Sequence, residues 1–221
     1  MLNLFKNFAN NYREDSFANT LRRKRFRLFH DHIDSLPKPL EIIDVGGTQL
    51  FWEQMNFLPD KDVEITILNL SKPATDKPGF TGIQGDATDM SQIPDNHFDV
   101  AFSNSVIEHV GDFQAQKRMA SEIQRIAKHY FVQTPSRYFP IEPHFLLPFF
   151  QFLPLWIKAW LILNLKLGWS PNINSKQKAK DAAKAIRLMS LKELKSMFPG
   201  GIIHKEKIFG FTKSYIISHK L

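Results

Sequence analysis

Cysteine is absent from the 221 residues of this chain. Its absence excludes disulfide bonds, thiolate metal ligands and a cysteine nucleophile, and it fits a reducing compartment. The sequence also lacks an H-x-x-x-H pair and an evident cluster of carboxylates, so no metal site is predicted. The few glycines form neither the G-x-G-x-x-G of a dinucleotide-binding loop nor a P-loop with its lysine, which argues against a pyrophosphate ligand.

The chain also lacks a long uninterrupted apolar run. A membrane-spanning helix needs roughly 20 apolar residues. The stretch 138–175 is rich in Phe, Leu and Trp, but Pro148, Pro154 and Lys158 interrupt it. We therefore expect an apolar lid insert. Three roles stay open for it: a buried cover over the active site, a patch that dips into a membrane, or a tunnel for a lipid tail.

Acidic residues are outnumbered, and the net charge is +7 with a pI near 9.5. Such a balance attracts anionic partners, among them nucleic acid, anionic lipid and a phosphorylated substrate. The basic residues concentrate at 22–27 and 176–187. The first cluster follows an amphipathic helical pattern, so it is either a solvated helix face or a surface for a membrane or an anionic substrate.

The apolar stretch within residues 1–8 is too short for a secretory signal peptide. Together with the absence of cysteine, it predicts a cytoplasmic protein. Peripheral contact with the inner face of a membrane stays open, because apolar and basic segments lie together in the second half of the chain.

Three short segments, each expected at the end of a strand, carry the functional signal: residues 41–48, 85–87 and 98–110. The first is an apolar run that ends in an acidic residue and is followed by Gly46 and Gly47. A ligand that lies against the backbone tolerates no Cβ, and a sharp strand-to-helix turn often needs a positive φ. The glycine pair meets both needs.

Taken together, these segments resemble the cofactor half of a class I methyltransferase that uses S-adenosylmethionine, and residues 40–135 resemble the broad type 11 methyltransferase family. The resemblance implies an α/β, Rossmann-like methyltransferase fold. Its mostly parallel seven-stranded sheet has an antiparallel C-terminal edge hairpin and helices on both faces. At this length we expect a single domain, 1–221, with an N-terminal helix at 14–36 and the lid insert at 138–175.

The pattern along the chain fits this fold, because extended apolar runs alternate with segments of helical periodicity. The expected strands are 41–45, 64–70, 81–84, 98–103, 129–134, 202–209 and 212–219. The expected helices are 14–36, 49–57, 113–128 and 190–198, with a lysine-rich link before the last one. Ser190 and Glu193 fit a capping box at the start of that last helix.

The resemblance also implies a cofactor site. Asp44 is expected to anchor the glycine loop and the methionine amino group, as a charge-assisted pair. Asn69 stands where the family usually carries an acid for the ribose hydroxyls. Asp86 is expected to accept from the adenine amine, and the Ala87 N–H to meet a ring nitrogen. The full set expected to bind S-adenosylmethionine is Asp44, Gly46, Gly47, Asn69, Leu70, Asp86, Ala87, Asn104 and Ser105.

Methyl transfer is an in-line displacement at a sulfonium carbon, so the enzyme must align nucleophile, methyl and sulfur. A hydroxyl nucleophile also needs a general base. His109, just past the fourth expected strand, and His144, at the mouth of the insert, are the catalytic candidates, although a structural role is open for each. Glu108 and His109 lie about one helical turn past Asn104, so at least one should face the cofactor or the substrate.

The leading hypothesis is methyl transfer to a small molecule, a sugar or a lipid-linked saccharide, because the insert suits an apolar or membrane-proximal acceptor. Residues 138–144 are similar to a segment of bacterial methyltransferases associated with surface polysaccharide assembly. An RNA methyltransferase is an alternative that the charge permits, although no RNA-binding motif is present. A non-catalytic, methyltransferase-like binding protein is the other alternative, suggested by Asn69 and the shortened glycine loop. The sequence predicts no oligomeric state.

Overall fold

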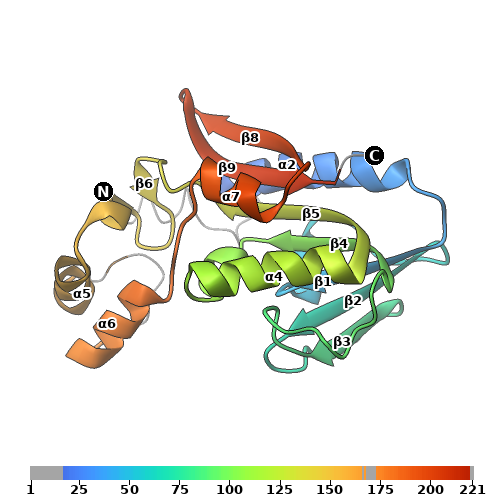
Figure 1. Cartoon of the computed structure of the whole chain (residues 1–221), viewed down its shortest axis with the longest axis horizontal. Coiled ribbons are helices and arrows are strands. Elements are labelled where there is room, and N and C mark those ends of the chain that lie inside the picture. The colour runs from blue at the N-terminus through green and yellow to red at the C-terminus, as the bar shows by residue number, and fades with distance from the viewer. Residues whose placement is uncertain (1–16, 166, 168–172, 220–221) are drawn as a thin grey trace.

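The computed structural model describes residues 17–165, 167 and 173–219 and shows an α/β fold built on one central sheet (Figure 1). The sheet has seven strands in the order β3-β2-β1-β4-β5-β9-β8. They are β1 (Leu40–Val45), β2 (Val63–Asn69), β3 (Phe80–Gln84), β4 (Phe98–Asn104), β5 (Ala127–Pro135), β8 (Ile202–Ile208) and β9 (Phe211–Ser218). The Rossmann-like methyltransferase fold predicted from the sequence is confirmed.

Six of the seven strands run in the same direction. Strand β1 pairs in parallel with β2 and β4, and the pairs β2–β3 and β4–β5 are parallel as well. Strand β9 is antiparallel to both of its neighbours, β5 and β8. The C-terminal hairpin therefore forms the edge of the sheet, with β8 outermost, as predicted.

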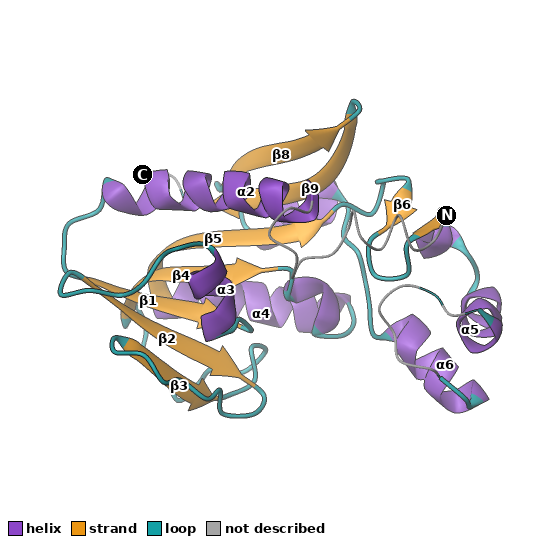
Figure 2. Cartoon of the chain, turned by 180° about the vertical axis from the view of Figure 1, so that it is seen from behind, coloured by secondary structure: helices purple, strands orange, loops and turns teal. Residues whose placement is uncertain are grey.

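Helices cover both faces of the sheet. Helices α2 (Phe17–Asp34) and α3 (Gln49–Gln54) pack on one face, and α4 (Phe113–Ile126) and α7 (Leu191–Met197) pack on the other. Figure 2 shows α3 in front of the sheet and α4 behind it. Strand β1 is buried at every position but one, which explains why its sequence is a nearly continuous apolar run.

Aromatic packing fixes α2 and α3 against the sheet. Phe29, Trp52 and Phe102 are fully or almost fully buried. The ring centroids of Phe29 and Phe102 lie 4.7 Å apart, and those of Trp52 and Phe102 lie 5.1 Å apart. Burial of each such side chain contributes roughly 1.5–3 kcal/mol, so this cluster holds the N-terminal helix firmly beside the glycine loop.

Some element boundaries differ from the sequence predictions. Helix α3 ends at Gln54 rather than at 57, because Asn56 turns the chain with a φ of +55°. Helix α4 ends at Ile126 rather than at 128. Ala127 is already extended and pairs with Phe98 of β4, so sheet pairing overrides the helical periodicity.

The prediction of a lysine-rich link before the last helix was wrong, because Lys176–Lys184 forms helix α6. The Ser175 side chain caps its start by accepting a hydrogen bond from the Lys178 N–H. Ala179 and Ala183, four residues apart, are buried in a cluster that α6 shares with α5 (Leu155–Asn164). The two alanines were the helical signal that the lysines obscured. The capping box predicted for α7 is present.

The described part of the insert forms a small subdomain with its own apolar cluster. It contains β6 (Ile141–Glu142), β7 (Leu147–Pro148), the 3-10 turn η2 (Phe150–Phe152) and α5, with α6 packed on it. Figure 2 shows β1, β4 and β5 pointing toward the side of the molecule on which this subdomain lies. No helix in the described ranges is long and apolar enough to cross a membrane.

Candidate active site

Two cavities adjoin at the carboxyl-terminal ends of the parallel strands, where Gly46 lines both. The larger encloses about 340 Å³ and is lined by Gly46, Leu68, Asn69, Leu70, Gly85, Asp86, Ala87, Ser105, Val106, His109 and Val110. The smaller encloses about 170 Å³ and is lined by Arg22, Asp44, Gly46, Gly47, Thr48, Leu50, Phe51, Gln54, Phe102 and Asn104. Every residue predicted to bind S-adenosylmethionine lines one of the two cavities, so the structure brings the whole set together.

The glycine loop leaves no room for side chains. Gly46 has a φ of +82°, and a Cβ there would lie 2.5 Å from Val106 Cγ1. A Cβ on Gly47 would lie 1.8 Å from Asp44 Oδ2. Both distances are far inside van der Waals contact, so the two glycines let the loop close over the Asp44 carboxylate.

Asp44 is a buried carboxyl with one open bonding site. Its Oδ2 accepts a hydrogen bond of 2.7 Å from the Trp52 indole N–H. Its Oδ1 is buried and has no hydrogen-bond partner among the described residues. Burial raises the pKa of Asp44 to about 7, against the opposing effect of the Trp52 bond. A cationic donor such as an ammonium would satisfy the open oxygen.

Asn69 and Asp86 lie at the other end of the crevice. The Asn69 amide donates to the Gly47 carbonyl over 3.4 Å and accepts from the Leu70 N–H over 3.0 Å. Asp86 Oδ1 accepts from the Thr88 N–H and hydroxyl, at 2.7 and 2.9 Å. Among the described residues, none donates a side-chain or backbone hydrogen bond to its second carboxylate oxygen, which can accept a donor from a ligand. Leu70 is exposed and flanks the opening.

Gln133, which the sequence analysis did not identify, supports the middle of the crevice through two hydrogen bonds with Ser105. Ser105 adopts a φ of +59°, and its N–H donates to the Gln133 carbonyl over 3.0 Å. Its hydroxyl donates to Gln133 Oε1 over 2.7 Å. Gln133 is buried in β5, and a polar residue in an otherwise apolar strand was the signal that could have identified it.

The two candidate catalytic histidines, 35 residues apart in the chain, are in contact through their rings. His109 lies in the 3-10 turn η1 (Ile107–His109), and His144 lies between β6 and β7. Their Nε2 atoms are 3.2 Å apart. On its other side, His144 Nδ1 lies 2.7 Å from Glu142 Oε1. Burial, together with the neighbouring His144, lowers the pKa of His109 to about 4. Burial opposes the charged form of His144, but the bond to Glu142 raises its pKa overall.

Glu108 turns inward beside this pair. The side chain is fully buried, and its Oε2 accepts a 3.0 Å hydrogen bond from the Thr134 hydroxyl. Its Oε1 has no hydrogen-bond partner in the described ranges. Burial raises the pKa of Glu108 to about 7. His109 lines the larger cavity and Glu108 does not, so His109 is the member of this turn that faces the cofactor site.

Part of the basic cluster at 22–27 faces this site. Arg22 lines the smaller cavity, and its guanidinium donates to Gln54 over 3.3 Å. Arg25 lies 3.4 Å from Glu206. Arg23 and Arg27 are exposed. The solvated-face interpretation therefore holds for one side of α2 only, and the other side places Arg22 at the crevice and Arg25 against β8.

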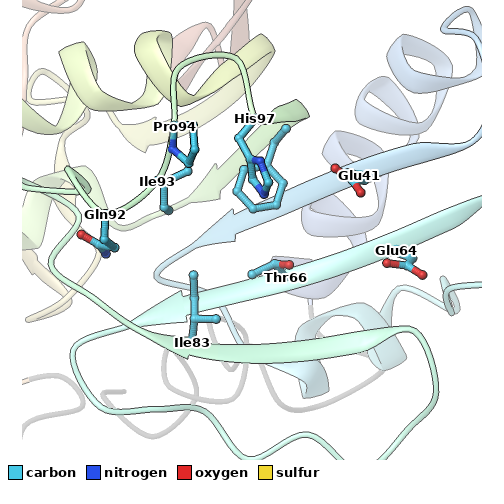
Figure 3. A pocket seen from close by; sticks show the side chains of 9 residues that line it. Glu41, Glu64, Thr66, Ile83, Gln92, Ile93, Pro94 and His97 are labelled. Atoms are coloured by element: carbon cyan, nitrogen blue, oxygen red, sulfur yellow. The ribbon is translucent and has the colours of Figure 1, made fainter.

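A third cavity lies away from the glycine loop. Figure 3 shows Glu41, Glu64 and His97 around it, with Thr66 and Ile83. Glu41 and Glu64 are paired residues near the amino-terminal ends of β1 and β2. This cavity is therefore separate from the carboxyl-terminal crevice and takes no part in the candidate site.

Comparison with known proteins agrees with this fold. Residues 53–130 match the model of the methyltransferase domain family. No curated protein matches the chain. Among solved structures, the CurJ carbon methyltransferase superposes with a TM-score of 0.59 at 10% identity, covering 95% of this chain and 56% of that one. This chain therefore spans little more than half of that protein.

Two further structures share the fold over most of their own length. A SAM-dependent methyltransferase from Methanosarcina mazei has a TM-score of 0.53 at 13% identity, covering 86% of this chain and 95% of that one. The YcgJ protein from Bacillus subtilis has a TM-score of 0.50 at 14% identity, covering 83% and 70%. These likenesses confirm the predicted Rossmann-like methyltransferase fold, and residues 53–130 carry the similarity to the methyltransferase domain family.

Proposed function

We propose that this protein, a class I S-adenosylmethionine-dependent methyltransferase by its fold and its family match, methylates a hydroxyl of a small molecule, a sugar or a lipid-linked saccharide. The observation that carries the proposal is the position of His109. It lines the cofactor cavity, and its ring contacts His144 of the insert. Cofactor site and insert therefore meet at one point, which is where an acceptor has to lie.

When bound, S-adenosylmethionine supplies an electrophilic methyl group on a sulfonium. The crevice offers a complementary group for each part of this cofactor. Asp44 Oδ1 would receive the amino group, because it is buried without a partner. Arg22 lines the same cavity and suits the carboxylate. Asn69 and Asp86 line the other cavity and suit the ribose hydroxyls and the adenine amine.

On the acceptor side, the chain must remove a proton and exclude water. The His109–His144 pair is the basic group beside the cavity, so it is suited to take the hydroxyl proton or to direct it away. The insert places its apolar cluster next to this pair, since Phe145 follows His144 in the chain and packs against Phe150 with their ring centroids 4.4 Å apart. An apolar acceptor fits this environment better than a strongly hydrated one.

The outer face of the insert suits an anionic membrane surface as the partner. Trp156 and Trp160, one turn apart on α5, are 73% and 59% exposed. Helix α6, which packs on α5, exposes Lys176, Lys178, Lys180 and Lys184. Interfacial tryptophans anchor proteins at the headgroup level. Each basic residue near an anionic bilayer contributes about 1 kcal/mol. Such contact would bring the crevice to a lipid-linked acceptor.

Two measurements test the function. Calorimetric titration with S-adenosylmethionine should show one binding site per chain, and absence of binding would favour the non-catalytic alternative. Labelled methyl from the cofactor should then appear in sugar or lipid-linked saccharide fractions. Transfer to RNA alone would contradict the proposed acceptor class. The Asp44→Asn variant serves as the matched control, because it should weaken both signals while it retains the fold.

A further inference from the structure

Three potential metal ligands from two distant segments converge beside the cofactor cavity. Glu108 and His109 come from η1, and His144 comes from the turn between β6 and β7. One ligand atom of each side chain lies within 4.8 Å of the others. The sequence predicted no metal here, because the histidines are 35 residues apart and match no helical ligand spacing.

The distance between the two imidazoles is that of a metal-binding pair. Two nitrogens bound tetrahedrally to zinc, at about 2.0–2.1 Å each, lie about 3.3 Å apart. The Nε2 atoms of His109 and His144 are 3.2 Å apart. Their rings are nearly perpendicular, with an interplanar angle of 86°, so the nitrogens face one another without ring stacking.

The groups around this pair supply two further features of a metal site. Metal-binding histidines commonly donate their second ring N–H to a carboxylate, which aims the other nitrogen at the ion. Glu142 Oε1 lies 2.7 Å from His144 Nδ1 and is placed to do so. Glu108 is fully buried, and its Oε1 has no partner in the described chain. A buried carboxylate oxygen without a partner is costly unless a ligand meets it.

We propose that Glu108, His109 and His144 bind a divalent transition metal ion, with Glu142 orienting His144. Two imidazoles and one carboxylate favour zinc, manganese, iron or cobalt over magnesium and calcium, which prefer oxygen-only shells. Glu108 approaches from the buried side, and His109 borders the open cavity. The coordination positions that the protein leaves vacant therefore face the cofactor crevice.

The role of this metal rests on the proposed function. An acceptor hydroxyl bound to the ion loses its proton to water more readily, because the ion lowers its pKa. The acceptor oxygen then forms a bond to the methyl carbon while the methyl–sulfur bond breaks and its electron pair stays on sulfur. The products are the methyl ether and S-adenosylhomocysteine, and the metal keeps its charge throughout.

Metal binding is tested directly, without catalysis. The purified chain, stripped with chelator, is titrated with Zn²⁺ by calorimetry and with Co²⁺ by its visible absorption. One ion per chain is expected, with a rise in melting temperature. His109→Ala and His144→Ala should each weaken binding by tenfold or more. Glu142→Gln should weaken it by roughly 10–100-fold, because it acts through His144.

The control is His97→Ala, an exposed histidine at the third cavity, which should leave metal affinity unchanged. No stoichiometric binding, or equal affinity in the wild type and in folded His144→Ala and His109→Ala variants, overturns the site. Titration with S-adenosylmethionine in the presence of chelator separates the two proposals. Metal binding without methyl transfer would retain the site and remove the function. Cofactor binding and methyl transfer that persist in the presence of chelator would retain the function and remove the proposed role of the metal.

Discussion

At the scale of single residues, Asp44 links the ligand to the protonation state of the protein. Burial raises its pKa from an ordinary 3.8 to about 7, so between these values the folded chain holds a proton that the unfolded chain releases. The contribution of Asp44 to the free energy of unfolding is therefore largest at low pH. It falls as the pH rises through this window and is constant above about 7.

An ammonium beside Asp44 favours the ionised carboxylate, so cofactor binding should release this proton below pH 7. We expect the affinity for S-adenosylmethionine to rise between about pH 5 and about pH 7 and then to level off. Asp44→Asn should weaken binding by roughly 1.5–3 kcal/mol and remove most of the slope. Calorimetry at several pH values checks this, and an unchanged slope in the variant would exclude Asp44 as the source.

Gly47 is predicted to tolerate no side chain. Gly47→Ala places a Cβ 1.8 Å from Asp44 Oδ2, so the loop must open and cofactor binding should be lost. Gly200→Ala is the control, because it meets no atom within 4 Å but has a φ of +80°. It should cost roughly 1–2 kcal/mol of stability from backbone strain and retain binding. Equal cofactor affinity in both variants would show that the collision is harmless.

At the scale of elements, helix α2 presents two different faces. Arg22 lines the smaller cavity, whereas Arg23, its neighbour in the chain, is exposed. Arg22→Ala should therefore weaken cofactor binding by roughly 1–3 kcal/mol through loss of a charged partner. Arg23→Ala should leave it unchanged. Titration of both variants with S-adenosylmethionine decides whether α2 takes part in the site. Equal cofactor affinities in the two variants would show that Arg22 does not bind the cofactor carboxylate.

The insert is predicted to bind anionic bilayers through α5. Replacement of Trp156 and Trp160 together by Ala should reduce co-sedimentation with anionic liposomes at least tenfold, because each buried aromatic contributes roughly 1.5–3 kcal/mol. Phe209→Ala is the control, since this residue is 96% exposed in the turn between β8 and β9. High salt should weaken binding further by screening α6. If the wild-type protein does not co-sediment with anionic liposomes at any salt concentration, the proposed membrane contact is wrong.

At the scale of the whole molecule, local patterns were enough to predict the sheet. The strands are short, and the central ones are largely buried, which β1 shows in a nearly continuous apolar run. The convergence of the predicted cofactor residues on one crevice was also predictable, because the ends of parallel strands meet by topology. Helix α6 was not, because its buried face is made of alanines that carry little hydrophobic signal.

Contacts between distant segments account for the rest. No local pattern places His144 against His109, since the insert folds back over η1 through its own apolar cluster. Arg22 reaches the crevice for the same reason, from a helix that aromatic rings pack against the sheet, and Gln133 of β5 contacts it through Ser105. Such residues are identified by tertiary packing rather than by spacing.

The position of β9 between β5 and β8 has a consequence for assembly. In the sheet, β8 pairs with β9 alone, so the whole C-terminal hairpin is attached to the sheet through the pairing of β9 with β5. Until that step, β5 has a free edge whose N–H and C=O groups can add a strand from another molecule. Docking of β9 thus covers the edge of β5, and a chain that reaches this step slowly is exposed to aggregation.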